Sequence, residues 1–100
     1  AFGMNAGLDM DKLISALSGG AASSWQMVNR SKTMVEGKFD FGFAIDWMRK
    51  DLGIALDEAE RNGSKLDVAR QVLGFYDELS AKGDGRLDTS SLILRLPRKA

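Results

Sequence analysis

Proline occurs only once in this chain, at Pro97, and the apolar residues recur at helical rather than strand spacing. Proline interrupts helices, so its confinement to the last few residues leaves the rest of the chain free to be helical. Alternation of β-branched and polar side chains, which is typical of strands, is rare. The sequence therefore predicts an all-α fold, and 100 residues are the length of a single domain.

Capping and stop residues divide the chain into about five helices. Asp9, Ser23 or Ser24, Asp67 and Asp88 are candidate N-caps, because their side chains can accept hydrogen bonds from the first turn of a helix. The predicted segments are residues 10–17, a short helix that carries Trp25 and Val28, residues 43–61, residues 67–82 and residues 88–96. Residues 30–42 mix Lys, Ser, Gly and aromatics, and they are predicted to form an irregular loop.

The composition excludes several classes of protein. The chain has no Cys and no His, which excludes disulfides, zinc sites with those ligands and Ser-His triads. None of its loops has the ligand spacing of a calcium site, so no metal is expected. Lys plus Arg and Asp plus Glu are 14 each, and this balance argues against nucleic acid as a partner. No apolar stretch is long enough to span a membrane, and a cytoplasmic location is expected.

The segment 43–61 carries two apolar stripes. On a helical wheel one stripe forms an ordinary core face: Ile45, Met48, Leu52, Ala55, Leu56 and Ala59. On nearly the opposite side lie Phe43, Trp47 and Ile54, with Lys50 between Trp47 and Ile54. An amphipathic surface helix needs only the first stripe.

Two explanations of the second stripe are open on periodicity alone. The helix could be central, with neighbours on both sides, and Lys50 would then reach water past the aromatics or pair with Asp46. Alternatively, the stripe is a surface for a missing domain or ligand, with Lys50 as its positive contact. Apolar stripes on helices usually belong to a core, so periodicity alone favours the first explanation.

The same segment resembles a family signature. Phe43 and the run Lys50-Asp51-Leu52-Gly53-Ile54-Ala55 match the pattern F-x-x-x-x-x-x-K-D-L-x-x-A of the β-hydroxyacid dehydrogenases, which include 3-hydroxyisobutyrate dehydrogenase. Four further blocks follow the order of that family: residues 6–9, 20–25, 62–66 and 83–92. Asp67 departs from the pattern, because proline is common there. The resemblance covers almost the whole chain.

The resemblance implies a fold and a place in a larger enzyme. Members of the family have an N-terminal Rossmann domain, a long connecting helix and a helical C-terminal domain of the 6-phosphogluconate-dehydrogenase type. Residues 1–100 are similar to that C-terminal domain, and the Gly-rich phosphate turn and the catalytic lysine lie outside them. The implied full-length protein transfers a hydride between NAD or NADP and a short β-hydroxyacid or semialdehyde. The chain by itself is then expected to be inactive.

The resemblance also assigns site residues. Lys50 corresponds to the family lysine that reaches the nicotinamide cofactor, and Phe43 and Asp51 correspond to residues that border the same cleft. With this signature the cofactor role of Lys50 is favoured over a free surface lysine. Asp51 could equally anchor a helix or pair with a basic residue. Trp25 corresponds to a position near the substrate pocket, although a core or interface aromatic is the commoner fate of such a residue.

The implied partners are the chain's own N-terminal Rossmann domain, a small-molecule substrate and further copies in a dimer or tetramer. In that assembly this domain closes one wall of the cleft and supplies most of the contact between subunits. The alternative is a stand-alone helical oligomerisation or interaction module without catalysis. The coding sequence upstream of Ala1 separates the two, since only the enzyme requires a strand, a Gly-rich turn and a Lys-x-x-x-Asn helix there.

Overall fold

A computed structural model describes residues 1–99 and shows a helical chain. The elements follow one another as α1 (Phe2–Asn5), α2 (Met10–Ser18), α3 (Trp25–Glu36), α4 (Ile45–Asn62), α5 (Asp67–Leu79), the π-helical turn η1 (Ser80–Asp84) and the 3-10 helix η2 (Thr89–Arg95). Within these residues there is no strand, and the only β-type pairing is an isolated bridge between Ala44 and Asp88. The all-α prediction is confirmed for this part of the chain.

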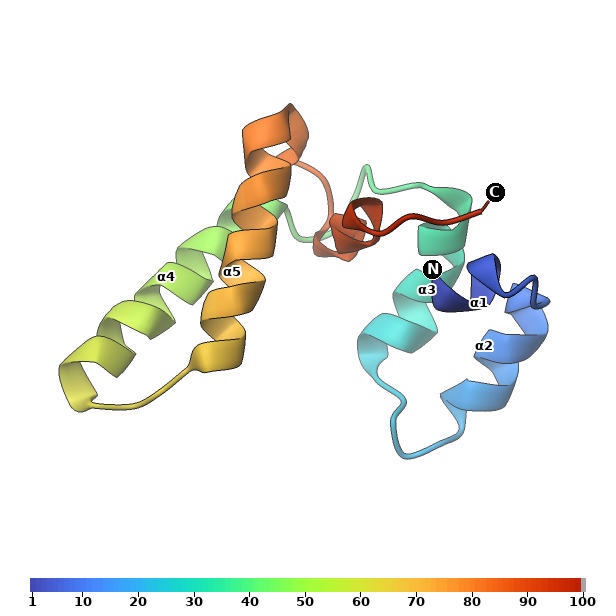
Figure 1. Ribbon diagram of the computed structural model, residues 1–100, viewed down its shortest axis with the longest axis horizontal. Coiled ribbons are helices and arrows are strands. Elements are labelled where there is room, and N and C mark those ends of the chain that lie inside the picture. Colours follow the sequence, from blue (N-terminus) through green and yellow to red (C-terminus); the bar gives the residue numbers. More distant parts are fainter. Residues whose placement is uncertain (100) are drawn as a thin grey trace.

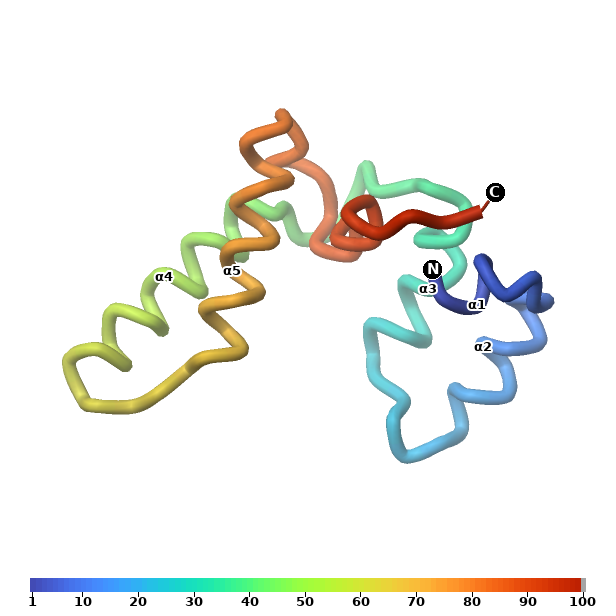
Figure 2. The backbone as a smooth tube through the Cα atoms, in the orientation of Figure 1, coloured from blue at the N-terminus to red at the C-terminus, as the bar shows by residue number. Residues whose placement is uncertain are grey.

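The helices form two lobes with η2 between them (Figure 1). Helices α4 and α5 run antiparallel, packed together near the start of α4 and the end of α5 and splayed apart toward the loop that joins them, while α1, α2 and α3 form the other lobe. Helix η2 contacts both α3 and α5, so it joins the lobes. The backbone trace shows that the loop before α4 and the segment before η2 cross between the lobes side by side (Figure 2). That crossing is fixed by hydrogen bonds from Ile45 N to Leu87 O and from Asp88 N to Phe39 O, each 2.9 Å long.

Local sequence signals explain most helix boundaries. The Asp9 carboxylate accepts a hydrogen bond from Lys12 N at 3.1 Å, and the Ser24 hydroxyl accepts one from Met27 N at 3.0 Å. Helices α3 and α4 end at Gly37 and Gly63, both in the left-handed region that glycine adopts without strain.

Two predicted boundaries were wrong. The loop expected at residues 30–42 begins only after Glu36, because α3 continues for two more turns to the Gly37 cap. The helix expected from Phe43 starts at Ile45, because Phe43 lies in a bend and Ala44 is extended, and both residues pair with the segment around Asp88 and Thr89. No helix of residues 1–99 has both the length and the hydropathy to cross a membrane.

The central core lies between α4 and α5. Ile45, Tyr76 and Leu79 are buried there, with five partly buried side chains packed around them: Met48, Leu52, Val72, Leu87 and Leu92. The Tyr76 hydroxyl donates a hydrogen bond to Thr89 O at 3.2 Å, which links α5 to η2. Leu56 and Ala59 continue the buried face of α4, as the first stripe predicts, whereas Ala55 is exposed.

The molecule is less compact than a typical folded domain of its length. Its radius of gyration is 15.1 Å, whereas a compact domain of this size has one of about 13 Å. Its accessible surface is 6908 Å², and a folded monomer of the same mass exposes about 5600 Å². The excess reflects the separation of the two lobes, and thirteen large hydrophobic side chains remain exposed on residues 1–99.

Candidate functional site

The outward face of α4 carries the second apolar stripe. Trp47 and Ile54 are 58% and 59% exposed, and Phe43, in the loop just before the helix, is 44% exposed. The spacing of seven residues keeps Trp47 and Ile54 on one side of the helix axis, whereas the position of Phe43 is set by the loop. Neighbouring helices therefore do not cover the stripe within residues 1–99, and the prediction of a central helix with neighbours on both sides was wrong.

Lys50 lies in the middle of this face. Its Nζ is 5.6 Å from the centroid of the Trp47 ring, within the range of a cation–π interaction. No carboxylate of residues 1–99 lies within ion-pair distance of that amine. The pairing of Lys50 with Asp46 that the sequence left open is not formed. The amine is thus a solvated cation beside exposed aromatic surface, available to a negatively charged group.

Asp46 is committed to a different network at the start of α4. Its carboxylate accepts hydrogen bonds from the Ser80 hydroxyl at 2.7 Å and from Arg49 at 3.1 Å, while Arg49 also binds Asp77 at 2.7 Å. The Ser80 and Arg49 hydrogen bonds lower the pKa of Asp46 below its ordinary value. This network fastens the start of α4 to the end of α5.

Asp51 follows Lys50 on α4 and is exposed. It forms no ion pair with any residue that the structure describes, so the alternative of a helix anchor paired to a basic residue lacks a partner here. A carboxylate one position after a lysine on a helix points about 100° away from it. The side chains of Lys50 and Asp51 therefore lie over neighbouring parts of the surface and do not converge on one point.

Trp25 is the first residue of α3 and is 60% exposed, so it is not a core residue in this chain. The guanidinium of Arg30 lies 4.8 Å from the centroid of its ring and 4.8 Å from that of Phe41. Arg30 is thus held between an α3 aromatic and an aromatic of the loop before α4. The loop brings Trp25 into indirect contact with the segment that contains Phe43.

Asp88 is the residue that the sequence reasoning assigned only as a helix cap. It is 1% exposed and accepts hydrogen bonds from Phe43 N at 3.0 Å, from Ser90 N at 3.0 Å and from the Ser90 hydroxyl. Its Oδ2 is also 3.3 Å from Arg30 Nε. Burial by itself would raise the pKa of Asp88, but the hydrogen bonds from Ser90 and Phe43 and the charge of Arg30 outweigh it, and the pKa is lowered.

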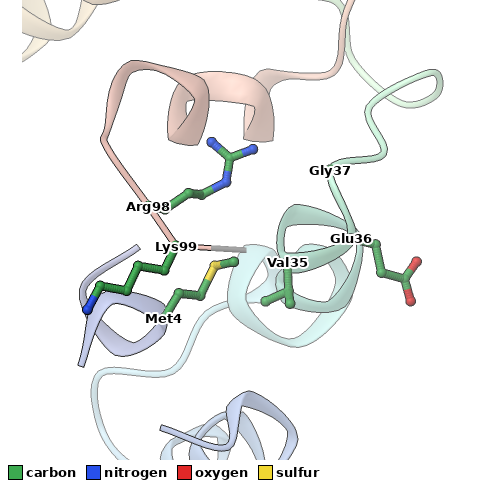
Figure 3. A pocket seen from close by; sticks show the side chains of 6 residues that line it. All are labelled: Met4, Val35, Glu36, Gly37, Arg98 and Lys99. Carbon is green, nitrogen blue, oxygen red and sulfur yellow. The ribbon is translucent and has the colours of Figure 1, made fainter. Parts of the chain in front are cut away.

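A hollow of about 410 Å³ lies between α1, the end of α3 and the C-terminal segment (Figure 3). Figure 3 shows Met4 and Lys99 on one side of it and Val35 and Glu36 on the other. Glu36 is paired with Lys38 at 3.2 Å, outside any cluster of titratable groups. The hollow includes none of the predicted site residues, and its mixed lining lacks the convergent polar groups of a catalytic site.

A second hollow, of about 340 Å³, opens between the lobes. Its lining is mainly apolar and comes from α3, α5, η2 and the residues Ala1 and Leu96 outside these helices: Ala1, Met34, Phe75, Leu92, Ile93, Arg95 and Leu96. Within residues 1–99 no three His, Cys, Asp or Glu side chains gather in a way that could hold a metal ion. The outward face of α4 is therefore the strongest candidate for ligand contact.

Comparison with known proteins adds a decisive observation. Residues 1–96 match the sequence profile of a family described as the NAD-binding domain of NADP-dependent 3-hydroxyisobutyrate dehydrogenase. The chain belongs to the 3-hydroxyisobutyrate dehydrogenase family. This confirms the resemblance found in the sequence, and family members of this kind use NAD or NADP.

Individual members of the 3-hydroxyisobutyrate dehydrogenase family agree with this assignment. An uncharacterized oxidoreductase of Shewanella frigidimarina is 63% identical over 97% of this chain and 33% of its own length. A probable 3-hydroxyisobutyrate dehydrogenase-like mitochondrial protein of Arabidopsis thaliana is 39% identical over 93% of this chain and 28% of its own length. The chain therefore spans about a third of the length of these relatives.

A solved structure shows the same fold. The crystal structure of 3-hydroxyisobutyrate dehydrogenase from Salmonella typhimurium superposes with a TM-score of 0.82 at 30% identity, covering 91% of this chain and 32% of that protein. The helical arrangement is thus that of one part of a 3-hydroxyisobutyrate dehydrogenase. Membership of this oxidoreductase family is shown, whereas the roles of Lys50, Phe43, Asp51 and Trp25 stay predictions.

Proposed function

We propose that this chain is the C-terminal helical domain of an NAD- or NADP-dependent dehydrogenase that acts on a short β-hydroxyacid or the corresponding semialdehyde. The helical domain is of the 6-phosphogluconate-dehydrogenase type, and in the full-length protein an N-terminal Rossmann domain binds most of the dinucleotide. Residues 1–100 then close the cleft over the cofactor and the substrate. The family match over residues 1–96, and the fact that related proteins are about three times longer, support this assignment.

The observation that carries the proposal is the solvated amine of Lys50 on the exposed aromatic face of α4. Trp47 lies under the amine, Ile54 follows one helical turn after Lys50, and Phe43 is exposed in the loop before the helix. When a second domain covers such a face, the apolar side chains exclude water, and a charge pair formed there becomes stronger than at an open surface. A dinucleotide offers phosphate and ribose oxygens that suit an ammonium donor. The residues present therefore fit an anionic cofactor.

Phe43, Asp51 and Trp25 take secondary roles in this proposal. Phe43 forms the apolar border of the cofactor cleft next to Lys50. Asp51 lies at the edge of the same cleft, where an unpaired carboxylate can accept hydrogen bonds from hydroxyl groups. Trp25, at the start of α3, forms part of the wall on the substrate side.

Hydride transfer itself depends on groups outside these residues. The nicotinamide, when bound, supplies or accepts the hydride, and a general acid/base must exchange a proton with the substrate oxygen. The chain has no His or Cys, and no titratable group on the α4 face is buried enough to be tuned for that task. We assign the proton transfer to a lysine of the full-length protein upstream of Ala1. Residues 1–100 alone are then inactive.

The amount of exposed surface supports the proposal that this domain contacts other protein in the full-length enzyme. Isolated residues 1–99 expose about 1300 Å² more than a compact monomer of their mass. That excess is the size of surface buried in a stable protein–protein contact. We assign it to the Rossmann domain of the same chain and to a second copy in a dimer or tetramer.

The test of this function is Lys50→Ala in the full-length protein. Loss of a charge-assisted hydrogen bond to the cofactor is expected to raise the KM for the dinucleotide about tenfold or more, with a smaller effect on the KM for the hydroxyacid. NAD and NADP are each varied against a panel of short β-hydroxyacids and semialdehydes. Lys65→Ala, which removes an exposed lysine from the loop at the far end of α4, is the matched control.

Unchanged kinetics of Lys50→Ala would leave Lys50 as a surface residue and remove the basis of the cofactor face. Absence of any dehydrogenase activity from the full-length wild type would favour the stand-alone helical module. The same module is favoured if the coding sequence upstream of Ala1 lacks a strand, a Gly-rich turn and a Lys-x-x-x-Asn helix.

A further inference from the structure

The buried carboxylate of Asp88 joins three segments that lie far apart in the sequence. Oδ1 accepts a hydrogen bond from Phe43 N in the loop before α4, and Oδ2 accepts from Ser90 at the start of η2. Arg30 of α3 places its Nε 3.3 Å from Oδ2. A side chain that only caps η2 would need the Ser90 contacts alone. The contacts of Asp88 with Phe43 and Arg30 are not needed for capping η2.

The loop before α4 is built closely around this carboxylate. Gly42 has a φ of +74°, and a Cβ added there would collide with the Asp88 carboxylate and lie 3.0 Å from the Arg30 guanidinium. The bridge between Ala44 and Asp88 and the hydrogen bond from Thr89 N to Phe43 O, 2.9 Å long, hold the same loop from the other side. The position of Phe43 is therefore set by Asp88 and not by α4 itself.

Arg30 extends the link to the other lobe. Its side chain is 19% exposed, and its guanidinium lies between the rings of Trp25 and Phe41. A planar guanidinium can stack on aromatic faces and still keep its charge toward a carboxylate, which an ammonium group cannot do equally well. A continuous series of contacts thus runs from Trp25 through Arg30 and Asp88 to Phe43.

We propose that Arg30 and Asp88 are positioning residues for the ligand-binding face, an inference that rests on the proposed function. Asp88 fixes Phe43 at the border of the cofactor cleft, and Arg30 fixes Trp25 on the substrate side relative to it. Neither residue touches the cofactor. Their loss lets the loop before α4 shift relative to α3, so that Phe43 and Trp25 no longer meet a bound ligand together.

The test uses Asp88→Asn and Arg30→Met in the full-length protein. Asparagine keeps an oxygen for Phe43 N but turns an amide N–H toward the donors of Arg30 and Ser90. Methionine keeps an apolar stem between Trp25 and Phe41 but removes the charge. Binding of NADH and of NADPH is measured by titration calorimetry, and the melting temperature is recorded for each variant.

Both variants are expected to raise the dissociation constant of the preferred dinucleotide on the order of tenfold. Arg30→Lys, which restores the charge without the planar stack, is expected to recover part of that affinity. Arg61→Met is the matched control, because Arg61 pairs only with Glu58 of its own helix on an exposed surface, and it is expected to bind like the wild type.

The inference is overturned if Asp88→Asn and Arg30→Met lower the melting temperature but leave dinucleotide affinity at the wild-type value. Should Asp88→Asn fail to fold, Arg30→Met and Arg30→Lys decide the matter by themselves. Lys50→Ala in the same titration separates this inference from the proposed function. If Lys50→Ala weakens binding while the Arg30 and Asp88 variants do not, only the positioning role fails. If all three bind normally, both proposals fail.

Discussion

At the residue scale, two glycines share a backbone conformation but not their surroundings. Gly37 and Gly42 have φ values of +73° and +74°, and a Cβ would meet open space at Gly37 but the Asp88 carboxylate at Gly42. Gly37→Ala is expected to cost about 1 kcal/mol of unfolding free energy from backbone strain alone. Gly42→Ala is expected to cost about 2 kcal/mol more from the collision. Urea denaturation of the two variants measures the difference, and equal losses would contradict the close approach.

The lowered pKa of Asp88 predicts a dependence of stability on pH. A carboxyl whose pKa is lowered by folding stabilises the folded state above its unfolded pKa of about 3.9, and that contribution is lost as the pH falls through the folded value. The difference in stability between the wild type and Asp88→Asn is therefore expected to be largest near pH 7 and to shrink below about pH 4. Denaturation curves at several pH values check this, and a constant difference would exclude the linkage.

The sequence could predict some site residues and not others. The spacing of Trp47 and Lys50 predicts a shared helix face, and both are exposed, whereas Phe43 was expected on the same helix and lies in the loop before it. The pairing of Arg30 with Asp88 joins residues 58 positions apart, and no local pattern carries that information. The one available signal was an Asp N-cap followed by Thr-Ser-Ser, which predicts a helix start but not a buried ion pair.

At the element scale, the contact between α4 and α5 carries the core of its lobe. Leu79 of α5 is 1% exposed, whereas Val68 of the same helix is 75% exposed. Leu79→Ala is expected to lower the unfolding free energy by about 2–5 kcal/mol through the cavity that it leaves. Val68→Ala is the control and is expected to change it by less than about 0.5 kcal/mol. A similar loss in both variants would mean that the hairpin is not the core of this lobe.

The elements that the sequence predicted well have a continuous apolar stripe. Helices α2 and α4 match the predicted segments within two residues at each end, and α5 begins at the predicted Asp67 but ends three residues early, at Leu79. Asp67 is the first residue of α5 and not its cap, and the N-cap residues of α4 and α5, Ala44 and Leu66, form no side-chain cap hydrogen bond. The second half of α3 lacks a stripe, because Ser31, Lys32 and Thr33 interrupt it, and only the left-handed glycine at Gly37 marks its end. The π-helical turn η1 was not predicted as such, although the helix was expected to stop at Gly83, whose φ of +95° is a conformation that glycine adopts without strain.

At the scale of the whole molecule, separated lobes and exposed hydrophobics indicate a domain that is completed by other protein. Two lobes joined mainly through η2 bury little apolar surface per residue, and a domain of this length is only marginally stable even when compact. The full-length protein is therefore expected to melt at a higher temperature than residues 1–100 expressed alone.

Residues 1–100 expressed alone are also expected to self-associate, because the α4 face is uncovered. Sedimentation velocity over a range of concentrations should show a rising weight-average mass. The double variant Trp47→Glu and Ile54→Lys should reduce that rise by placing charges on the face. The pair Glu60→Lys and Arg70→Glu, at exposed polar positions, is the control. A wild-type fragment that stays monomeric at every concentration would argue against this surface as a contact.

The two tryptophans of the chain give the molecule a pair of built-in optical reporters. Each indole has a cation over its ring, Arg30 at Trp25 and Lys50 at Trp47, and each is more than half exposed. A protein with phenylalanine at one of these positions would emit from the other alone. Emission from Trp25 would then follow movement between the lobes, and emission from Trp47 would follow occupation of the α4 face, so stopped-flow experiments on the two variants could time the two events separately.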